Sequence, residues 1–218
     1  AQISALSSDE IVYGLTSTQI AALSTDQFRA FSPQQIGWIQ TWDIPALTSA
    51  QIGSLTTSQA GGLYGYQLAA MPSWQISSFS GAQLSAFSST QLSGLSQSQI
   101  SSSLTSAQIS ALTPAQIASW SATQFRALTT TQLAGLTTAQ ISALSSDEIV
   151  YGLTSTQIAA LSTDQLRAFS PQQIGWIQTW DIPALSSTQI SSLTTSQAVG
   201  LYGYQLAAMP SLSLIHIS

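Results

Sequence analysis

Two pairs of adjacent carboxylates are the residues whose type and spacing come closest to a chemical site. They are Asp9-Glu10 and a second copy, Asp147-Glu148, and a tyrosine follows each pair three residues later. Adjacent carboxylates can bind a hard cation weakly through their oxygens. The other interpretation, which we favour, is that each pair opens a short helix, where negative charge is stabilising.

Aromatic residues recur in clusters and could form a contact surface. Aromatic rings combine a large apolar face with a polar edge, which suits stacking on a sugar ring or on another protein surface. The alternative is that these side chains fill the core where the repeat is irregular. The candidate contact residues are Trp38, Trp42, Tyr64, Tyr66, Trp74, Trp176, Trp180, Tyr202 and Tyr204.

Few other residues in the sequence could support catalysis. The chain has no cysteine, and its single histidine, His216, lies in a terminal segment that departs from the rest of the sequence. We find no glycine-rich phosphate loop and no His/Asp/Glu cluster with metal-ligand spacing. We therefore expect no enzyme activity, no cofactor and no metal centre. No apolar run approaches the length of roughly 18 to 20 residues that a membrane span needs.

An eight-residue repeat runs through almost the whole chain, with the pattern Ser/Thr-x-x-Gln-Ile-x-x-Leu. We number its positions p1 to p8, with glutamine at p2, an apolar residue at p3, leucine or a substitute at p6 and Ser or Thr at p7. Up to Ser211 there are 26 units, and p2 is glutamine in 22 of them. One-residue insertions interrupt the period at 9–17, 98–106 and 147–155.

The repeat has the signature of a helix start. Ser or Thr followed three residues later by Gln or Glu is a capping box, and apolar residues at p6 and p3 are placed for a hydrophobic staple. Pro33, Pro114 and Pro171 each follow a p7 residue, which is the first helical position. All eight acids lie at p1 or p2 and all three arginines at p4, the order that a helix dipole favours.

The period of eight excludes one continuous helix. At about 100° per residue, the apolar pair would spiral around the rod rather than form a stripe. We therefore predict an all-α fold, a solenoid or superhelix of very short, kinked helices with one helix per unit. The alternative is a β-solenoid with about two units per coil; p3 and p6 would then face opposite sides of a strand.

Some units break the pattern. Pro45 and Pro183 fall in what would be helix interior, so these units should be bent or irregular. Tyr64 and Pro72, with the copy Tyr202, replace the capping Ser or Thr.

A longer period lies on top of the short one. Residues 1–73 recur as 139–211 with five differences, an offset of 138 residues or 17 units. We interpret 1–211 as a single array, with a super-repeat over 1–138 and the start of its second copy at 139–211, cut from a longer protein. Residues 212–218 resemble a translated sequencing adapter, so we exclude them as a non-native tail.

One local match concerns DNA. Residues 112–117 resemble the opening helix of transcription activator-like effector repeats. The resemblance covers six residues, and a chain with net charge −5 and no lysine cannot neutralise phosphates as DNA binding requires. We expect no nucleic-acid partner.

The array as a whole resembles the Leu-Thr-x-x-Gln-Ile repeat tracts of very large secreted or surface proteins of bacteria. That resemblance implies an extracellular or cell-surface setting and a structural role, as a segment of a fibre or adhesin stalk that associates with itself. An alternative is an adhesion module whose aromatic clusters bind glycans. Ice binding would require the β-solenoid with a flat threonine face. The many hydroxyls would also suit O-glycosylation, at p8 and p1 before p7.

Overall fold

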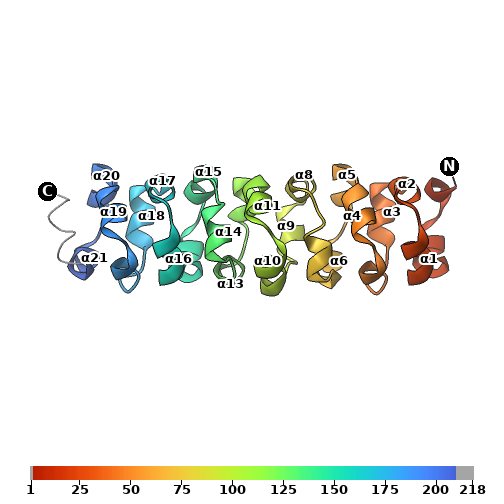
Figure 1. Ribbon diagram of the computed structural model, residues 1–218, viewed down its shortest axis with the longest axis horizontal. Coiled ribbons are helices and arrows are strands. Elements are labelled where there is room, and N and C mark those ends of the chain that lie inside the picture. The colour runs from red at the N-terminus through yellow and green to blue at the C-terminus, as the bar shows by residue number, and fades with distance from the viewer. Residues whose placement is uncertain (1, 210–218) are drawn as a thin grey trace. The chain divides into compact units, whose positions relative to one another are not determined.

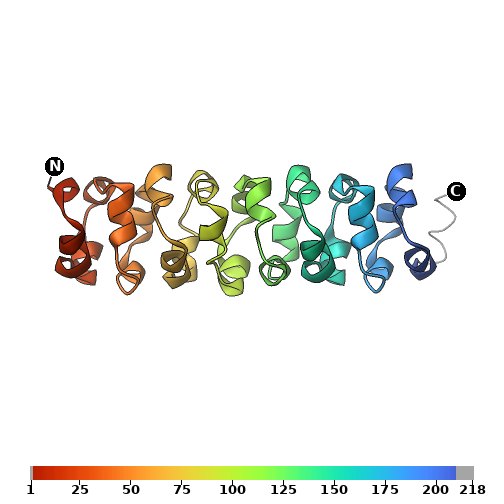
Figure 2. The ribbon, with the colours of Figure 1, turned by 180° about the vertical axis from the view of Figure 1, so that it is seen from behind.

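The computed structural model describes residues 2–209, which form short helices joined by extended linkers. These residues contain no β-strand (Figure 1, Figure 2). The prediction of an all-α repeat fold is confirmed, and the β-solenoid alternative is wrong. The ice-binding hypothesis loses the flat β face on which it depended. The chain divides into two compact units, Ala1–Leu112 and Thr113–Ser218.

The described residues of the first unit form eleven α-helices and three short helices of other types. The short ones are the 3₁₀-helices η1 (Ile3–Ala5) and η3 (Ile44–Ala46) and the π-helix η2 (Glu10–Gly14). The α-helices are α1 (Ser17–Ala22), α2 (Thr25–Arg29), α3 (Pro33–Trp38), α4 (Ser49–Ser54), α5 (Thr57–Ala60), α6 (Gly65–Ala70), α7 (Ser73–Ile76), α8 (Gly81–Ser85), α9 (Ser89–Leu92), α10 (Gln97–Ser103) and α11 (Ser106–Ala111).

The second unit repeats this organisation. Its π-helix is η4 (Glu148–Gly152) and its 3₁₀-helix is η5 (Ile182–Ala184). Its described α-helices are α12 (Pro114–Ile117), α13 (Ala122–Arg126), α14 (Thr130–Ala134), α15 (Thr138–Ser142), α16 (Ser155–Ala160), α17 (Thr163–Ala168), α18 (Pro171–Trp176), α19 (Ser187–Ser191), α20 (Thr195–Val199) and α21 (Gly203–Ala208).

Capping boxes start most of these helices, as the sequence predicts. At α2, the backbone N–H of Gln27 donates to Ser24 Oγ over 3.2 Å, and the Ser24 N–H donates to Gln27 Oε1 over 2.9 Å. The same reciprocal pair recurs wherever p7 is Ser or Thr and p2 is Gln within the described chain from Thr16 onward. The three prolines predicted at the first helical position begin α3, α12 and α18.

The p6 residue bends the chain between helices. Leu23 after α1 has φ −65° and ψ 133°, an extended conformation that stops the helix. Its N–H still donates to the Ile20 carbonyl, so the helix closes with a tight last turn. The next capping box then begins immediately, and the chain turns once per unit.

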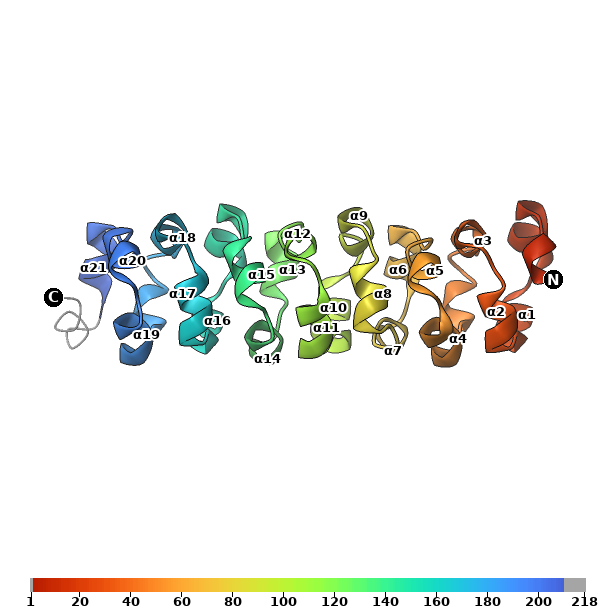
Figure 3. The same cartoon turned by 90° about the horizontal axis from the view of Figure 1, so that it is seen from above.

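The p3 and p6 side chains form the core of each unit. Ile36, Ile39, Ile52 and Leu63 are at most 2 % exposed, and most other p3 and p6 side chains of both units are buried. Helices three repeats apart in sequence pack together, such as α4 with α7 and α6 with α9. Figure 3 shows these two pairs on opposite edges of the first unit. Burying a large apolar side chain contributes about 1.5–3 kcal/mol to stability, and this contribution is gained only when turns stack.

The p2 glutamines join one turn to the next. Gln51 Nε2 donates to the carbonyls of Ile20 (2.8 Å) and Leu23 (2.9 Å), four repeats earlier. The donors and acceptors of such bonds lie 28 to 32 residues apart in both units. They are made by Gln35, Gln51, Gln59, Gln67, Gln75, Gln83, Gln91, Gln99, Gln108, Gln157, Gln165, Gln173, Gln189, Gln197 and Gln205.

The carbonyls that accept these bonds lie at or just past the helix C-terminus, where no residue of the same helix supplies an i+4 donor. Where both bonds are present, as at Gln51, the glutamine caps its own helix through Oε1 and the end of an earlier helix through Nε2. A helix of four to seven residues has few internal bonds, so both ends of these helices depend on glutamine.

The irregular units have identifiable causes. The insertions at 9–17 and 147–155 are absorbed as the π-helices η2 and η4, and the one at 98–106 lengthens α10 to seven residues. At the proline-containing units, the chain turns and continues as the 3₁₀-helices η3 and η5, as predicted. None of the helices in residues 2–209 combines the length and apolar character needed to cross a bilayer.

Candidate contact site

The two carboxylate pairs behave as helix starts. Glu10 Oε2 accepts hydrogen bonds from the backbone N–H and the hydroxyl of Ser7, each over 2.8 Å. Glu148 accepts the equivalent pair from Ser145. The interpretation as a capped helix start is confirmed. Residues 2–209 hold no group of three or more His, Cys, Asp or Glu side chains arranged for a metal ion.

Most of the candidate aromatic residues lie on the surface. Trp42 is 69 % exposed and Trp180 72 %, and the other exposed members are Tyr64, Tyr66, Trp74, Tyr202 and Tyr204. Trp38 and Trp176 are half-buried. The alternative that these side chains fill the core is therefore wrong for the exposed seven, because p3 and p6 residues already occupy the core.

The tyrosines form stacked pairs. Tyr64 and Tyr66 have ring centroids 5.2 Å apart with planes 15° from parallel, and Tyr202 and Tyr204 repeat this at 5.3 Å and 14°. The first ring of each pair lies over a glycine. A Cβ on Gly37 would stand 2.8 Å from Tyr64 Cε2 and 2.9 Å from the Gly62 carbonyl oxygen. Glycine at p4 therefore lets the tyrosine lie flat against the preceding turn.

A groove beside the second tyrosine pair gathers several of the candidate residues. We call it the aromatic groove: it measures about 270 Å³ and contains Trp176, Tyr202 and Tyr204. Gln178 and Thr179 supply polar side chains, and Val150 comes from the π-helix η4. Trp180 does not line this groove. The structure thus brings together three of the four aromatic candidates of the second copy.

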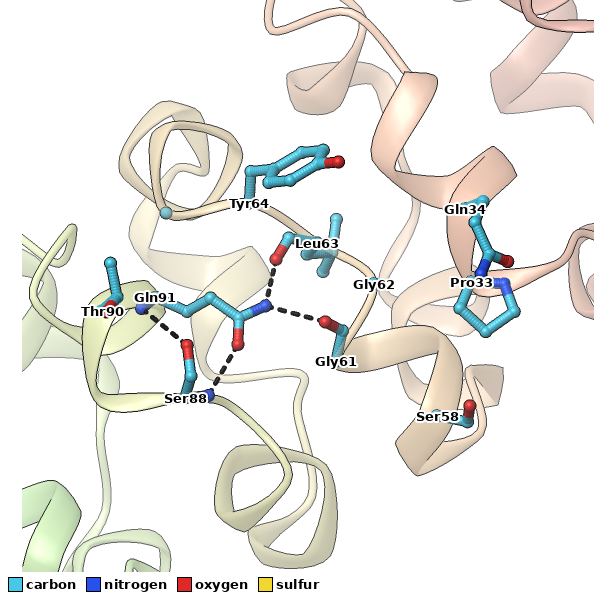
Figure 4. A pocket seen from close by; sticks show the side chains of 11 residues that line it. Pro33, Gln34, Ser58, Gly61, Gly62, Leu63, Tyr64, Ser88, Thr90 and Gln91 are labelled. Atoms are coloured by element: carbon cyan, nitrogen blue, oxygen red, sulfur yellow. Dashed lines mark hydrogen bonds between the residues drawn. The ribbon is translucent and has the colours of Figure 1, made fainter.

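A larger groove lies beside Tyr64 in the first unit. We call it the glycine groove because Gly61, Gly62 and Gly65 line it, and its volume is about 550 Å³. Figure 4 shows Pro33 and Gln34 on one side, Thr90 and Gln91 on the other, and the 61–64 segment between them. Ser58, Leu63 and Ser88 complete the lining.

Glycine at position 62 is required by close packing. A Cβ there would lie 2.2 Å from the Pro33 carbonyl oxygen, and the copy, Gly200, stands equally close to the Pro171 carbonyl. Two turns of backbone meet at this point. The floor of the glycine groove is therefore main chain rather than side chain.

Neither groove carries a charged lining residue; the tyrosine phenols are the only ionisable groups. Burial, and then the neighbouring Tyr64, raise the pKa of Tyr66 above its ordinary value of 10.0. The Tyr66 phenol, which lies beside the glycine groove without lining it, therefore keeps its proton at neutral pH and can donate a hydrogen bond. Two arginines lie elsewhere and bond to main chain: Arg126 to the Tyr151 carbonyl over 2.8 Å and Arg167 to that of Ser192 over 2.8 Å.

The polar and glycine residues of these grooves were not among the candidates predicted from the sequence. Gln178 and Thr179 sit in a proline-interrupted unit, and nothing in the octad distinguishes them from solvent-facing residues. The glycines had a visible signal, since Gly61 and Gly62 replace the usual Ala or Ser at p4 and p5. Which earlier helix they approach depends on the number of units per turn.

Comparison with known families supports a repeat. A family model named the ALTTAQ repeat matches residues 121–151, which span α13 to η4. The match covers a small part of the chain and supports a repeat tract there. Among curated proteins, no sequence matches the chain. Together with the fold, the match defines the chain as a tandem helical repeat protein.

Proposed function

We propose that this chain is a structural segment of an extracellular or cell-surface fibre or stalk, in which each unit adds length. The observation that carries the proposal is the bond from p2 glutamines of both units to carbonyls four repeats earlier. A unit of this kind is a donor toward one neighbouring turn and can accept from the next. Such a chain can be extended without any change in its contacts.

Duplication supports the same role. Residues 1–73 and 139–211 differ at five positions, so almost all side chains at contacts between turns are retained. A stalk gains from uniform copies because each turn must match the next. The bacterial setting comes from the resemblance of the octad to repeat tracts of large surface proteins.

The proposal can be tested by display on a bacterial surface. One, two or three copies of residues 1–138 are placed between a surface anchor and an epitope. A stalk predicts that binding of a bulky antibody to the epitope rises with each copy, as the epitope moves away from the surface. Equal binding with one and three copies would argue against a length-building role.

A second candidate function is glycan binding by the aromatic clusters. The aromatic groove favours it, since exposed, stacked tyrosines lie beside the amide and hydroxyl of Gln178 and Thr179. Neither side chain has a hydrogen-bond partner among the described residues. An uncharged groove with aromatic faces and free polar groups suits a neutral sugar.

Affinity electrophoresis in gels containing hydroxyethyl cellulose, xylan or dextran tests this function. We expect the chain to be retarded in at least one gel, and the double variant Tyr64→Ala/Tyr204→Ala, which removes a lining ring from each groove, to migrate freely. Tyr13→Ala/Tyr151→Ala is the control, since Tyr13 (83 %) and Tyr151 (62 %) are exposed but line neither groove. Unretarded migration of the parent chain in all three gels would remove the glycan hypothesis.

A further inference from the structure

The glycine groove has polar groups that the fold leaves unused. The side chains of Gln34, Ser58 and Thr90 line it, are exposed, and make no hydrogen bond to other described residues. They come from three separate helices, α3, α5 and α9. Groups from three turns of the solenoid are therefore presented to one elongated space.

Tyr64 belongs both to the lining of the glycine groove and to the stacked pair Tyr64–Tyr66. Its ring lines the glycine groove, is 51 % exposed, and stacks on Tyr66. In the copied segment, the equivalent Tyr202 lines the aromatic groove together with Trp176 and Tyr204. The same tyrosine position is thus an aromatic wall for both kinds of groove.

The floor and charge of the groove restrict the ligand. The floor is the backbone of Gly61, Gly62 and Gly65, so a ligand there meets main chain rather than side chains. The lining holds amides, hydroxyls and one phenol, without a cation to pair with an anionic ligand. The volume of about 550 Å³ lies within the range of roughly 300–1,000 Å³ found for small-ligand sites.

We propose that the glycine groove is a binding subsite for an extended, neutral, β-1,4-linked glycan that stacks on Tyr64. The proposal rests on the glycan-binding function above and adds a separate binding site in the first unit. An extended β-1,4 chain presents flat ring faces to the phenol and equatorial hydroxyls to Gln34, Ser58 and Thr90. The wall from α9 lies outside the recurring 1–73 segment, so residues 139–211 by themselves carry no equivalent of it.

The chain provides a matched control for this subsite. Gln34 and Ser58 have copies at Gln172 and Ser196, and all four residues are exposed. The groove variant is Gln34→Ala/Ser58→Leu, which removes two polar groups and narrows the groove. The control is Gln172→Ala/Ser196→Leu, the same changes in the second unit. Circular dichroism should give the same helix content for both variants and the parent.

Isothermal titration with cellohexaose and cellobiose tests the proposal. We expect the parent chain to bind cellohexaose at least about tenfold more tightly than cellobiose, because the longer ligand covers Tyr64 and the polar groups of the glycine groove together. The groove variant should lose most of this advantage while its cellobiose affinity stays unchanged. The control variant should match the parent with both sugars.

Three results would overturn the proposal, and they differ in what else they remove. Equal cellohexaose binding by the groove variant and the parent removes the subsite but leaves glycan binding. Failure of the parent to bind cellohexaose, with retardation in the dextran gel, removes the β-1,4 ligand class alone. Absence of cellohexaose binding and of retardation in every gel removes both the subsite and the glycan function.

Discussion

At the residue scale, the p2 glutamine uses both ends of its amide. Gln67 is fully buried; its Oε1 accepts from the Tyr64 N–H over 2.7 Å, and its Nε2 donates to the Ile39 carbonyl over 2.7 Å. Glutamate could supply the first bond but not the second. This explains why p2 is glutamine in 22 of 26 units although a capping box accepts either residue.

The first prediction separates these two roles. Gln67→Glu keeps the acceptor but places a carboxylate against carbonyl oxygens, so we expect a loss of about 2–4 kcal/mol in the free energy of unfolding. Gln27→Glu is the matched control, because Gln27 is exposed and its side chain bonds only to the capping residue. It should change stability by less than about 0.5 kcal/mol. Urea unfolding measures both; equal losses would contradict the two-ended role.

The second prediction concerns pH. Hydrogen bonds from the Ser7 backbone and hydroxyl hold the pKa of Glu10 below its ordinary value of 4.5. A carboxyl with a lowered folded-state pKa stabilises the fold above its unfolded-state pKa, and this contribution is lost as pH falls through the folded-state value. The cap of η2 should therefore weaken below about pH 4.5, whereas Glu10→Gln should remove the dependence. NMR titration of the Glu10 carboxyl carbon checks the direction; a midpoint above 4.5 would contradict it.

At the element scale, the helices differ mainly in how well they are capped. α7 begins after Pro72, which has neither a side-chain acceptor nor an N–H for Gln75. Gln75 Oε1 is consequently buried without a hydrogen-bond partner, although its Nε2 still bonds to Ile44 and Leu47. This unit carries the cost of a buried, unsatisfied p2 acceptor, which the described units with a Ser or Thr cap avoid.

The third prediction follows from that cost. Pro72 has φ −64° and ψ 157°, close to the serine caps, so Pro72→Ser should form a full capping box. Satisfying a buried acceptor gains about 1–3 kcal/mol, offset by about 0.4–1 kcal/mol for the freer unfolded chain. We expect a higher urea midpoint. Ser80→Pro, the reverse change at α8, should lower it; unchanged midpoints in both would show that the cap bond is unimportant.

The fourth prediction tests close packing between elements. Gly62→Ala would push a methyl group into the Pro33 carbonyl, so we expect a loss of at least about 2 kcal/mol. Gly53→Ala is the comparison: its Cβ would meet only the Ser78 carbonyl oxygen at 3.7 Å, and alanine favours helix by about 0.5–1 kcal/mol. Opposite shifts in thermal midpoint are expected. A tolerated Gly62→Ala would mean that the two turns are not in contact.

The helix starts were predictable from sequence because capping is local. The bonds between Ser24 and Gln27 span three residues, and each of the three prolines directly follows its own capping residue. The bond from Gln51 to Ile20 could not be derived, because it requires the number of repeats per turn. The π-helices were also not predicted, since an inserted residue can be absorbed as a bulge, a longer linker or a wider helical turn.

At the scale of the whole molecule, the sequence predicted a helical array and the aromatic candidates, but not where the latter meet. Trp176, Tyr202 and Tyr204 share a groove because residues three to four repeats apart lie on adjacent turns. Trp180, closer in sequence to Trp176 than Tyr202 is, does not join them. Surface clusters in a solenoid depend on the turn, and sequence spacing alone does not give it.

The fifth prediction concerns length, and it tests the central claim that each unit adds an equal increment through the same contacts. One further copy of residues 1–138, joined before Ala1, reproduces the native junction between 138 and 139 and raises the array from 26 to 43 units. Small-angle X-ray scattering of both chains measures the cross-sectional radius and the longest dimension. We predict an unchanged cross-section and a longest dimension greater by about two thirds, in proportion to the units added. Growth of both dimensions together would contradict the account.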